Sequence, residues 1–373
     1  MFRLGSIAIA TIAALLSTLS FAANYAVGTC DTKLASYTTI SQAVSSVPPG
    51  ATILVCPNNY PEQVLITRPL TIKGFPGQNA PVIVVPPGGL VSSLYSTQVG
   101  TIVYQVAVNG VTGGSVNLSG LIVDGTGNLL APGCCDLAGV YYQDASGTVD
   151  GVSVRNQTDD FGGFGIMVAT VNSAASQAVT IENSDVRGYD AYGMYVTLDN
   201  GPLAADIKAN VVENAGGFDG IYARGPVTGT ITGNLINNSG NGFDMQLSGS
   251  PGPAMTVSSN TILVNGVYPN PNIGILAVNG SSTIKSNTID VGNLGAGIVL
   301  AGSASGSTVQ SNTITNAPTG WGIIGCSVYG NASGFTVTGN IIVDASTGVD
   351  MPSGNTSTAN KFFAVTTPVA TCP

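Results

Sequence analysis

Charged residues that could do chemistry are concentrated in about one quarter of this 373-residue chain. Of the 19 acidic residues, 12 lie between Asp136 and Asp219. The basic residues in or beside this stretch are Arg155, Arg187, Lys208 and Arg224. Neighbouring carboxylates can bind Ca²⁺, and a Lys or Arg beside them can accept a proton. The candidate catalytic residues are then Lys208, Arg187 and Arg224. The candidate calcium ligands are Asp159, Asp160 and Asp185.

These residues also have a simpler interpretation. Acidic and basic side chains on one surface can form local ion pairs and keep a protein soluble without binding a ligand. The sequence contains neither an EF-hand loop nor a nonapeptide calcium repeat. A solvated charged face therefore stays open as the alternative to a catalytic or calcium site, and calcium is the only cofactor that the residues suggest.

The composition favours a β-rich fold with tight turns. Only 8% of the residues are charged, 44% are hydrophobic, and the chain contains 50 glycines and no histidine. Such a chain is neither a charge-rich disordered protein nor a typical helical globule. With a net charge of -9 and only ten Lys and Arg, it has no basic patch for a phosphate backbone, so we expect no nucleic-acid partner.

Residues 1–23 resemble a secretory signal peptide. Arg3 precedes the apolar run "LGSIAIATIAALLSTLSFAA", and Ser20 and Ala22 are small residues at cleavage spacing. No comparable apolar run follows, so we expect no membrane insertion once this segment is removed. The sequence thus predicts a secreted protein, extracellular or periplasmic.

Six cysteines in an exported chain favour disulfide bonds. Pairing Cys30 with Cys56, and Cys326 with Cys372, would fasten each end of the chain. Cys134 and Cys135 then form either a vicinal disulfide or a free pair. Spacing alone does not decide the connectivity, and neither a C-x-x-C motif nor a histidine accompanies these residues to suggest a metal site.

An asparagine recurs about every 26 residues in the pattern I-x-x-N-x-I. The six positions are Asn210, Asn234, Asn260, Asn287, Asn312 and Asn340. A repeat of this length indicates a solenoid. We expect each asparagine to lie at a bend, where its short amide tolerates unusual dihedral angles and bonds the backbone and the next asparagine.

A second repeat element, a glycine followed by alternating apolar residues, falls between the asparagines. Alternation with a period of two predicts short strands, and the spacers are too short for helices. Stacked coils of such strands form parallel sheets about 4.8 Å apart. The first predicted inward row is Ile207, Ile231, Val257, Ile284, Val309 and Val337. The second predicted inward row is Ile221, Phe243, Ile275, Ile298, Ile323 and Val349.

The outward position two residues after the repeat glycine predicts a binding surface. Tyr195, Tyr222 and Asp244 occupy this position in successive coils, with Asp219 and Arg224 beside them. Tyrosine rings can stack on a sugar ring while the polar groups bond its hydroxyls. Stacked tyrosines are also common on ordinary sheet surfaces, so that interpretation stays open.

The ends and one insertion depart from the repeat. Residues 24–60 are expected to form an N-terminal cap and entry coil, because "YTTISQAVSSVPPG" has a possible capping box at Thr39 and Gln42 and apolar residues at helical spacing. Residues 126–148 are expected to protrude as a loop, since they are too long for a turn. Residues 352–373 form the C-terminal end of a single domain, 24–373.

With "TISQAVSSVPPGATILVCPNNYPEQVLITRPLTIKGF" at its entry and "SNTI"-type coils after it, the chain resembles the pectin lyase-like superfamily. The resemblance covers nearly all of residues 24–373 and implies a right-handed, single-stranded parallel β-helix. It says little about activity, because this fold carries lyases, hydrolases, esterases, epimerases, tailspikes and non-catalytic surface proteins.

Each subclass makes its own demand on the residues. The absence of histidine argues against polygalacturonases, with their Gly-His-Gly motif, and against His-dependent epimerases. Tyr60 and Glu62 in "NNYPEQV" resemble an early motif of pectin methylesterases, but the L-G-R-P-W motif of that family is missing. A calcium-assisted polysaccharide lyase needs no histidine, because acidic residues hold Ca²⁺ against a uronate carboxylate while Lys208 or an arginine removes the C5 proton.

The sequence thus predicts an exported protein that binds or processes an extracellular polysaccharide or cell-surface glycan. The alternative is a non-catalytic surface, structural or adhesive β-helix. The two differ in geometry: a lyase site requires Arg187, Lys208 and Arg224 on one face, whereas a structural protein can scatter them.

Overall fold

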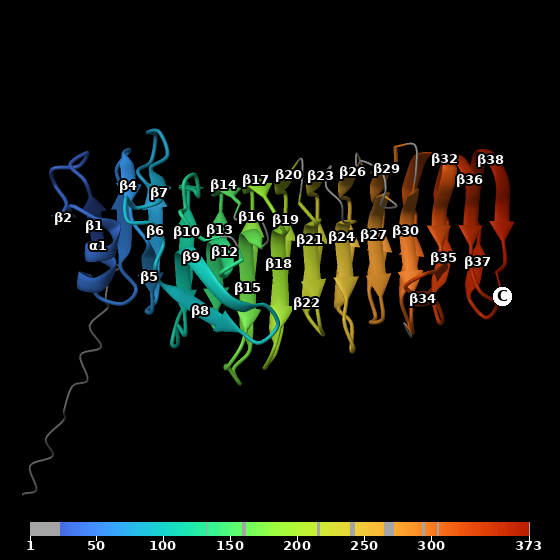
Figure 1. The fold of residues 1–373 in the computed structure, drawn as a ribbon, viewed down its shortest axis with the longest axis horizontal. Helices are drawn as coiled ribbons and strands as arrows, with labels where there is room; N and C mark the ends of the chain where they lie inside the picture. The colour runs from blue at the N-terminus through green and yellow to red at the C-terminus, as the bar shows by residue number, and fades with distance from the viewer. Residues whose placement is uncertain are drawn as a thin grey trace, which may run out of the picture.

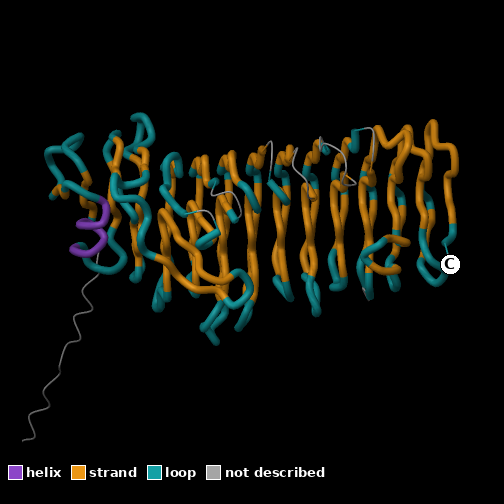
Figure 2. Tube along the Cα trace, viewed as in Figure 1, coloured by secondary structure: helices purple, strands orange, loops and turns teal. Residues whose placement is uncertain are grey.

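Each coil of the chain contributes up to three short strands, and the strands of successive coils stack into long parallel columns (Figure 1). The structure, a computed structural model, describes residues 23–131, 133–158, 162–214, 217–238, 243–264, 272–292, 295–303 and 306–372. The coils follow one another along the long axis, so the one helix of the described residues and the last strands lie at opposite ends (Figure 2). The predicted all-β parallel β-helix with an N-terminal helical cap is confirmed.

The first column is a sheet of 14 strands whose pairings are all parallel. In spatial order its strands are β2 (Ser36–Tyr37), β1 (Asn24–Val27), β3 (Thr52–Val55), β6 (Leu70–Gly74), β10 (Val116–Ser119), β13 (Gly147–Asp150), β16 (Gln177–Glu182), β19 (Leu203–Lys208), β22 (Thr228–Thr232), β25 (Ala254–Ser258), β28 (Thr283–Lys285), β31 (Thr308–Gln310), β35 (Thr336–Thr338) and β37 (Thr356–Thr358).

The second and third columns belong to a sheet of 22 strands. The second column contains β4 (Asn59–Pro61), β7 (Val82–Val84), β11 (Ile122–Asp124), β14 (Ser153–Gln157), β17 (Asp185–Tyr189), β20 (Val211–Asn214), β23 (Leu235–Asn238), β26 (Thr261–Leu263) and β29 (Thr288–Asp290). The third column contains β5 (Val64–Ile66), β9 (Gly100–Asn109), β12 (Asp136–Gln143), β15 (Gly163–Thr170), β18 (Tyr192–Leu198), β21 (Asp219–Arg224), β24 (Phe243–Ser248), β27 (Asn272–Val278) and β30 (Gly295–Ala301). The long strands β32 (Thr313–Ile324), β36 (Ile341–Asp350) and β38 (Lys361–Ala370) run through both columns.

Two hairpins interrupt the parallel stacking. In the first, β8 (Ser93–Ser96) pairs antiparallel with the start of β9, and in the second β33 (Cys326–Ser327) pairs antiparallel with β34 (Gly330–Asn331). They are the only antiparallel strand pairs in the described parts of the chain. Both lie beside the third column, where they meet its outward side chains.

The core is one continuous apolar cluster inside the coils, built from inward rows of side chains. All six residues of the first predicted inward row are buried, and five of the six in the second row are as well. Inward Val and Ile at the same phase stack on their counterparts in the next coil, which removes apolar surface from water along the whole solenoid. The periodicity in the sequence therefore predicted the core, with one exception.

The exception is the coil that begins at Phe243, where the predicted register is wrong by two residues. Met245 pairs with Ile221 and Ile275 and fills the inward row, while Phe243 lies among outward side chains. Asp244 therefore stands level with Gly220 and Gly274, at the position that a glycine fills in the neighbouring coils. Asp244 is thus buried instead of facing outward beside Tyr222, and Gln246 takes the predicted outward position.

The asparagine ladder is confirmed as part of the scaffold. Each asparagine donates both its backbone N–H and its side-chain Nδ2 to the Oδ1 of the next, as from Asn260 to Asn287 at 3.0 and 2.9 Å. Its Nδ2 also donates to a backbone carbonyl of the preceding coil, as from Asn260 to Ile231. The ladder begins with Ser184, whose N–H donates to Asn210, and ends at Asn360.

The bend geometry differs from the prediction in one respect. The residue before each asparagine, not the asparagine itself, has the left-handed backbone, as at Ala209 (φ 55°) and Ser286 (φ 55°). The asparagine is then free to turn its amide inward, where it satisfies buried backbone groups. The repeat therefore requires asparagine for its hydrogen bonds and not for its dihedral angles.

The helical cap is α1 (Ile40–Ser46), which covers the first coils (Figure 1). Thr39 accepts a hydrogen bond from the Gln42 N–H, as the predicted capping box requires. The Glu62 carboxylate accepts from the N–H groups of Ile40 and Ser41, both at 2.8 Å. Tyr60 donates its hydroxyl proton to the Cys56 carbonyl. The esterase-like Tyr60 and Glu62 thus have structural roles.

The predicted protruding loop at 126–148 is wrong over most of its length. Residues 136–143 form β12 and residues 147–150 form β13. Each of these strands pairs with a strand on both of its sides. The alternation in "DLAGVYYQ" is that of an ordinary strand, which the long spacing from the previous repeat concealed. The excursion is confined to residues before Asp136 and contains Cys134 and Cys135.

All three disulfides considered in the sequence are present. Cys30 is bonded to Cys56, Cys326 to Cys372, and Cys134 to its neighbour Cys135. The first bond fastens the N-terminal cap, and the second fastens the β33–β34 hairpin to the end of the chain. The third closes no long loop and holds the segment before β12.

Candidate functional site

The three candidate catalytic residues lie in three different columns. Lys208 ends β19 in the first column, Arg187 lies in β17 of the second, and Arg224 ends β21 of the third. The structure does not bring them to one face, so they cannot act together on one substrate bond. A lyase site was expected to have all three residues on one face, so the prediction of a site built from all three is wrong.

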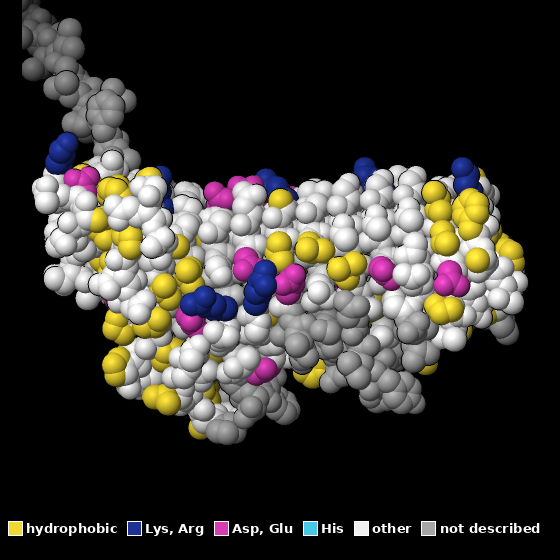
Figure 3. All heavy atoms as spheres, turned by 90° about the horizontal axis from the view of Figure 1, so that it is seen from above, with side chains coloured by type: hydrophobic (Ala, Val, Ile, Leu, Met, Phe, Trp, Pro, Cys, Tyr) yellow, Lys and Arg dark blue, Asp and Glu magenta, His cyan; other side chains and the backbone are white. Residues whose placement is uncertain are grey.

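Arg187 and Lys208 are engaged in surface ion pairs. The Arg187 guanidinium bonds Asp185 at 2.7 Å and Glu213 at 2.9 Å, and the Lys208 ammonium lies 3.3 Å from Glu182. Acidic and basic side chains lie side by side over the middle coils in the space-filling view (Figure 3). Both residues thus belong to solvated local ion pairs, each on its own column, as in the simpler interpretation of the charge cluster.

The candidate calcium ligands gain no support from the described residues. Asp185 accepts from Arg187, while Asp159 and Asp160 lie outside the residues that the structure describes. Over the described ranges, the one group of three acid or thiol ligands is Cys326, Asp350 and Cys372, and both cysteines are in a disulfide. The described carboxylates therefore do not form an oxygen-ligand site of the kind that Ca²⁺ prefers.

Four aromatic rings gather on the outward face of the third column. Tyr192 and Tyr195 from β18 stack with their centroids 5.0 Å apart, and Tyr222 from β21 lies 5.3 and 5.2 Å from them. Phe164 from β15 lies 5.4 Å from Tyr192. The cluster arises because Phe164 pairs with Tyr192, and Tyr195 with Tyr222, in the parallel register. Tyr195 and Tyr222 were predicted from the repeat phase, and the structure brings them together.

Arg224 and the Tyr195 ring both line the same hollow, so the guanidinium lies beside the aromatic cluster. Burial raises the pKa of Tyr195, so its hydroxyl keeps its proton at neutral pH and can still donate it. No described carboxylate forms an ion pair with Arg224, in contrast to Arg155, Arg187 and Lys208. Arg224 is thus the basic residue of the cluster whose charge is available to a ligand.

These side chains line a hollow that we call the tyrosine groove. It has a volume of about 200 Å³. Its lining residues are Gln98, Val99, Asp136, Gly162, Phe164, Ala191, Tyr192, Tyr195, Phe218 and Arg224. A second hollow of about 210 Å³ shares Val99 and Asp136 and extends to the Cys134–Cys135 disulfide. The two hollows are therefore neighbours on the surface.

One wall of the tyrosine groove is the turn of the β8–β9 hairpin. The carboxylate of Asp199, which follows β18, accepts from the Ser96 hydroxyl at 3.0 Å and from the Thr97 N–H at 2.8 Å. Gln143 donates to the Tyr95 carbonyl. These bonds hold Gln98 and Val99 over the aromatic cluster. The wall is therefore preformed, as binding sites on rigid scaffolds generally are.

Two buried carboxyl groups, Asp219 and Asp244, lie in the two strands that follow β18 in the third column and do not line the hollow. Asp219 pairs in register with Tyr192 and is 3% exposed. Burial raises the pKa of Asp219 to about 7, although the Phe243 N–H donates to it. Burial also raises the pKa of Tyr189 well above its ordinary value, with Asp244 and Asp219 adding to the effect. Asp219 can therefore exchange a proton near neutral pH, and Asp244 lies beneath the surface and not on it.

Sequence reasoning missed several residues of this site. Tyr192, Phe164 and Asp136 are outward residues of the third column, and Gln98 and Val99 come from the hairpin. Tyr192 precedes the repeat glycine in "YGMYV", so a search of the position before each glycine would have found it. No repeat signal marks Gln98 and Val99, because the hairpin lies outside the repeat.

Comparison with known proteins agrees with this architecture. A family profile described as "Right handed beta helix region" matches residues 138–342, more than half of the chain. The chain therefore belongs to the right-handed β-helix family, and its resemblance to the pectin lyase-like superfamily is confirmed for the fold. No curated protein matches the sequence.

Solved structures give the same result. The A-module of the mannuronan C-5 epimerase AlgE4 from Azotobacter vinelandii is 15% identical, with 89% of this chain and 93% of that chain covered and a TM-score of 0.59. A GH136 lacto-N-biosidase from Eubacterium ramulus is 12% identical, with 91% and 68% covered and a TM-score of 0.60. At these identities the likeness shows the fold alone. Over the described part of the chain, no helix is long and apolar enough to cross a membrane.

Proposed function

We propose that the tyrosine groove binds an acidic polysaccharide, with Arg224 pairing with a carboxylate and the half-buried Tyr192 ring, supported by the buried Tyr195, stacking on a sugar. The observation that carries this proposal is the state of Arg224. Arg155, Arg187 and Lys208 are all neutralised by carboxylates, while Arg224 faces the groove beside aromatic rings. A guanidinium binds a carboxylate through two parallel hydrogen bonds, so an acidic sugar suits this site better than a neutral one.

Further observations support a carbohydrate as the ligand. Stacked aromatic rings beside a few polar groups suit an amphipathic ring, and the two neighbouring hollows admit a chain. The names of the two structural neighbours are those of an epimerase acting on mannuronan and of a lacto-N-biosidase. Three disulfides fit an oxidising compartment, which supports the proposal that the protein acts outside the cytoplasm.

Binding measurements with matched variants test this proposal. We expect polyuronate chains to bind the protein and neutral dextran to bind much more weakly, as measured by calorimetry. Arg224→Ala should lower the affinity for polyuronate tenfold or more, because it removes a charge-assisted pair worth about 1.5–3 kcal/mol. Arg187→Ala removes the same charge from another column and should change the affinity less than twofold. Equal losses in the two variants would show general charge attraction and contradict the proposal.

A second candidate function, processing of the bound polysaccharide, is favoured by the position of Asp219, which pairs in register with the lining residue Tyr192 and follows the lining residue Phe218, together with its raised pKa. In a β-elimination its carboxylate would take the C5 proton while the C4–O bond breaks with its electron pair on the leaving oxygen. A C4=C5 double bond would form, and a hydroxyl such as that of Tyr192 would protonate the oxygen. The test is the ultraviolet absorbance of the unsaturated product. Its appearance in the wild type and loss in Asp219→Asn, with binding retained, would support processing. Binding without product would support the non-catalytic alternative.

Calcium binding is a separate proposal that concerns Asp159 and Asp160. The described carboxylates do not form a site around Asp185, so no step of the reaction above uses the ion. Calorimetric titration with CaCl₂, comparing the wild type with Asp159→Asn/Asp160→Asn, tests it directly. Heat of binding that the double variant loses would support the proposal, and no heat in either protein would overturn it.

A further inference from the structure

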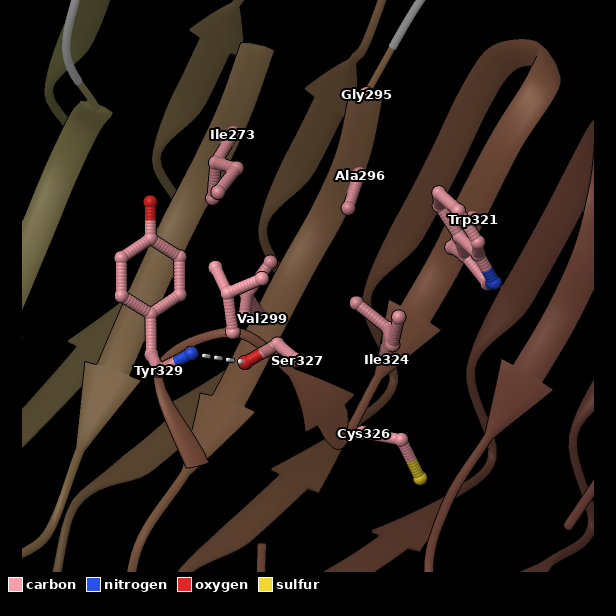
Figure 4. Close-up of a pocket in the computed structure, with 10 residues that line it drawn as sticks. Ile273, Gly295, Ala296, Val299, Trp321, Ile324, Cys326, Ser327 and Tyr329 are labelled. Carbon is pink, nitrogen blue, oxygen red and sulfur yellow. Dashed lines mark hydrogen bonds between the residues drawn. The ribbon is translucent and has the colours of Figure 1, made fainter. Parts of the chain in front are cut away.

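A second hollow, independent of the tyrosine groove, lies on the third column near the C-terminal end. It has a volume of about 240 Å³ and lies between β27, β30 and β32 and the β33–β34 hairpin (Figure 4). We call it the hairpin pocket. Its lining residues are Ile273, Gly295, Ala296, Val299, Trp321, Ile324, Cys326, Ser327, Val328 and Tyr329. Nothing in the proposed polysaccharide site uses it.

The hairpin pocket has an aliphatic floor and two aromatic sides. Val299 and Ile324 lie between the Tyr329 ring on one side and the Trp321 indole on the other (Figure 4). Trp321 is 38% exposed and Tyr329 is 40% exposed. Leaving such large apolar side chains in water is unfavourable, and exposed apolar clusters of this kind mark binding sites.

The pocket is held open by the chain itself. Cys326 at the base of the hairpin is bonded to Cys372, and the Ala332 N–H donates to the Gly325 carbonyl at 2.7 Å. The Tyr329 N–H donates to the Ser327 hydroxyl, and the Tyr329 ring contacts Phe243 edge-on at 5.7 Å. These contacts fix the side of the pocket before any ligand arrives, so binding would cost little ordering of the chain.

We infer that the hairpin pocket binds a small, uncharged aromatic compound. None of its lining residues is charged, so an ionised ligand would lose its hydration without gaining a partner. An apolar cavity of about 150 Å³ is enough to hold benzene, so this pocket can hold one ring with a substituent. Trp321 and Tyr329 on its two sides can contact the edges or face of that ring, in the arrangements that aromatic pairs prefer.

The chain supplies its own reporter for this site, because Trp321 is its only tryptophan. 4-Nitroanisole, a neutral aromatic quencher, is a suitable probe. We expect saturable quenching of the tryptophan fluorescence, with a dissociation constant on the order of 0.1 mM for a ligand of this size. Glucose at the same concentrations should leave the fluorescence unchanged.

Three variants test whether 4-nitroanisole binds in the hairpin pocket. Tyr329→Ala, which removes one side of the pocket, should weaken binding about tenfold. Tyr95→Ala removes an exposed tyrosine from the other hairpin and should leave binding unchanged. Val299→Asp places a carboxylate on the floor and should abolish saturable quenching. Thermal unfolding of each variant shows that it is folded.

Three results would overturn the inference. One is quenching that rises linearly without saturation, and another is equal binding by wild type, Tyr329→Ala and Val299→Asp. The third is a dimer in sedimentation velocity that Val299→Asp dissociates and 4-nitroanisole does not. That result would place a second copy of the chain in the hairpin pocket. Because the test uses no polysaccharide, its failure is distinguishable from failure of the tyrosine groove.

Discussion

The tyrosine groove and the hairpin pocket lie on the same column of one solenoid, yet their chemistry is opposite. Each is walled by one of the two antiparallel hairpins of the described chain, β8–β9 in the first and β33–β34 in the second. The groove contains Arg224, Asp136 and tyrosine hydroxyls, while the pocket contains aliphatic side chains and two aromatic rings. Both rest on parallel strands of the third column, so the outward side chains and the hairpin beside them set what each can bind.

The comparison also separates structure from chemistry along the chain. The asparagine ladder and the inward Ile and Val rows repeat in every coil between the two hollows, and they give the same scaffold to both. The hollows occur where the chain leaves the repeat. In this protein, regularity marks what holds the fold together, and departures from regularity mark where ligands can bind.

The largest expected effect comes from breaking the scaffold that the two regions share. Asn260→Ala removes the acceptor of the Asn234 backbone N–H and Nδ2, and the donor to the Ile231 carbonyl, all buried. The Asn234 Nδ2 keeps its bond to the Ile207 carbonyl, so two groups are left unsatisfied at about 1–3 kcal/mol each, and the unfolding free energy should fall by about 2–6 kcal/mol. Urea unfolding measures this. Asn117→Ala, at a half-exposed position in β10, is the matched control and should cost less than about 0.5 kcal/mol.

The next effect concerns Asp219 and the pH dependence of the stability that it causes. The folded-state pKa of Asp219, about 7, lies above its unfolded value near 4, so the folded protein binds the extra proton. The stability from this group is complete below about pH 4 and is lost as the pH rises through about 7, by about 4 kcal/mol in total. Asp219→Asn should remove this loss while keeping the acceptor for Phe243. Melting curves across this pH range compare the two, and parallel curves would contradict the assigned pKa.

A smaller effect tests whether Tyr195 positions Arg224. Tyr195→Phe keeps the aromatic ring but removes the hydroxyl oxygen that lies in the same hollow as the guanidinium. We expect the affinity for polyuronate to fall about fivefold, equivalent to about 1 kcal/mol. Tyr222→Phe, whose hydroxyl lies 2.9 Å from the Ser248 hydroxyl, is the control and should bind as the wild type does. If Tyr222→Phe bound more weakly than Tyr195→Phe, the Tyr222 hydroxyl and not that of Tyr195 would position Arg224.

The smallest expected change in stability is that of the vicinal disulfide. Cys134→Ser/Cys135→Ser opens a bond between neighbours that closes no loop, so the unfolding free energy should change by less than about 0.5 kcal/mol. Cys326→Ser/Cys372→Ser opens a bond across 46 residues and should cost about 2–4 kcal/mol. Both are measured by thermal unfolding. A large loss in the first variant would show that the segment before β12 supports the fold as well as the groove.

The sequence predicted the parts of this molecule that repeat. The asparagine phase and the alternation of apolar residues predicted the coils, the inward rows and the place of Tyr195 and Tyr222, because one register governs every coil. The same register misplaced Asp244, because in that coil an aspartate stands where the others have glycine.

The features that no repeat specifies could not be predicted. Lys208 and Arg187 looked equivalent to Arg224 in the sequence, and only the distribution of strands among three columns separates them. Gln98 and Val99 reach the groove through a hairpin whose docking depends on Asp199, about one hundred residues later. Such contacts depend on the three-dimensional path of the chain and not on local pattern.

The most direct test of the tyrosine groove is a crystal structure of the protein soaked with a short polyuronate. We expect density for a sugar ring against Tyr192, with one carboxylate within hydrogen-bonding distance of the Arg224 guanidinium. Density on the ion-paired face of Arg187 and Lys208 instead, with the groove empty, would contradict the proposed site.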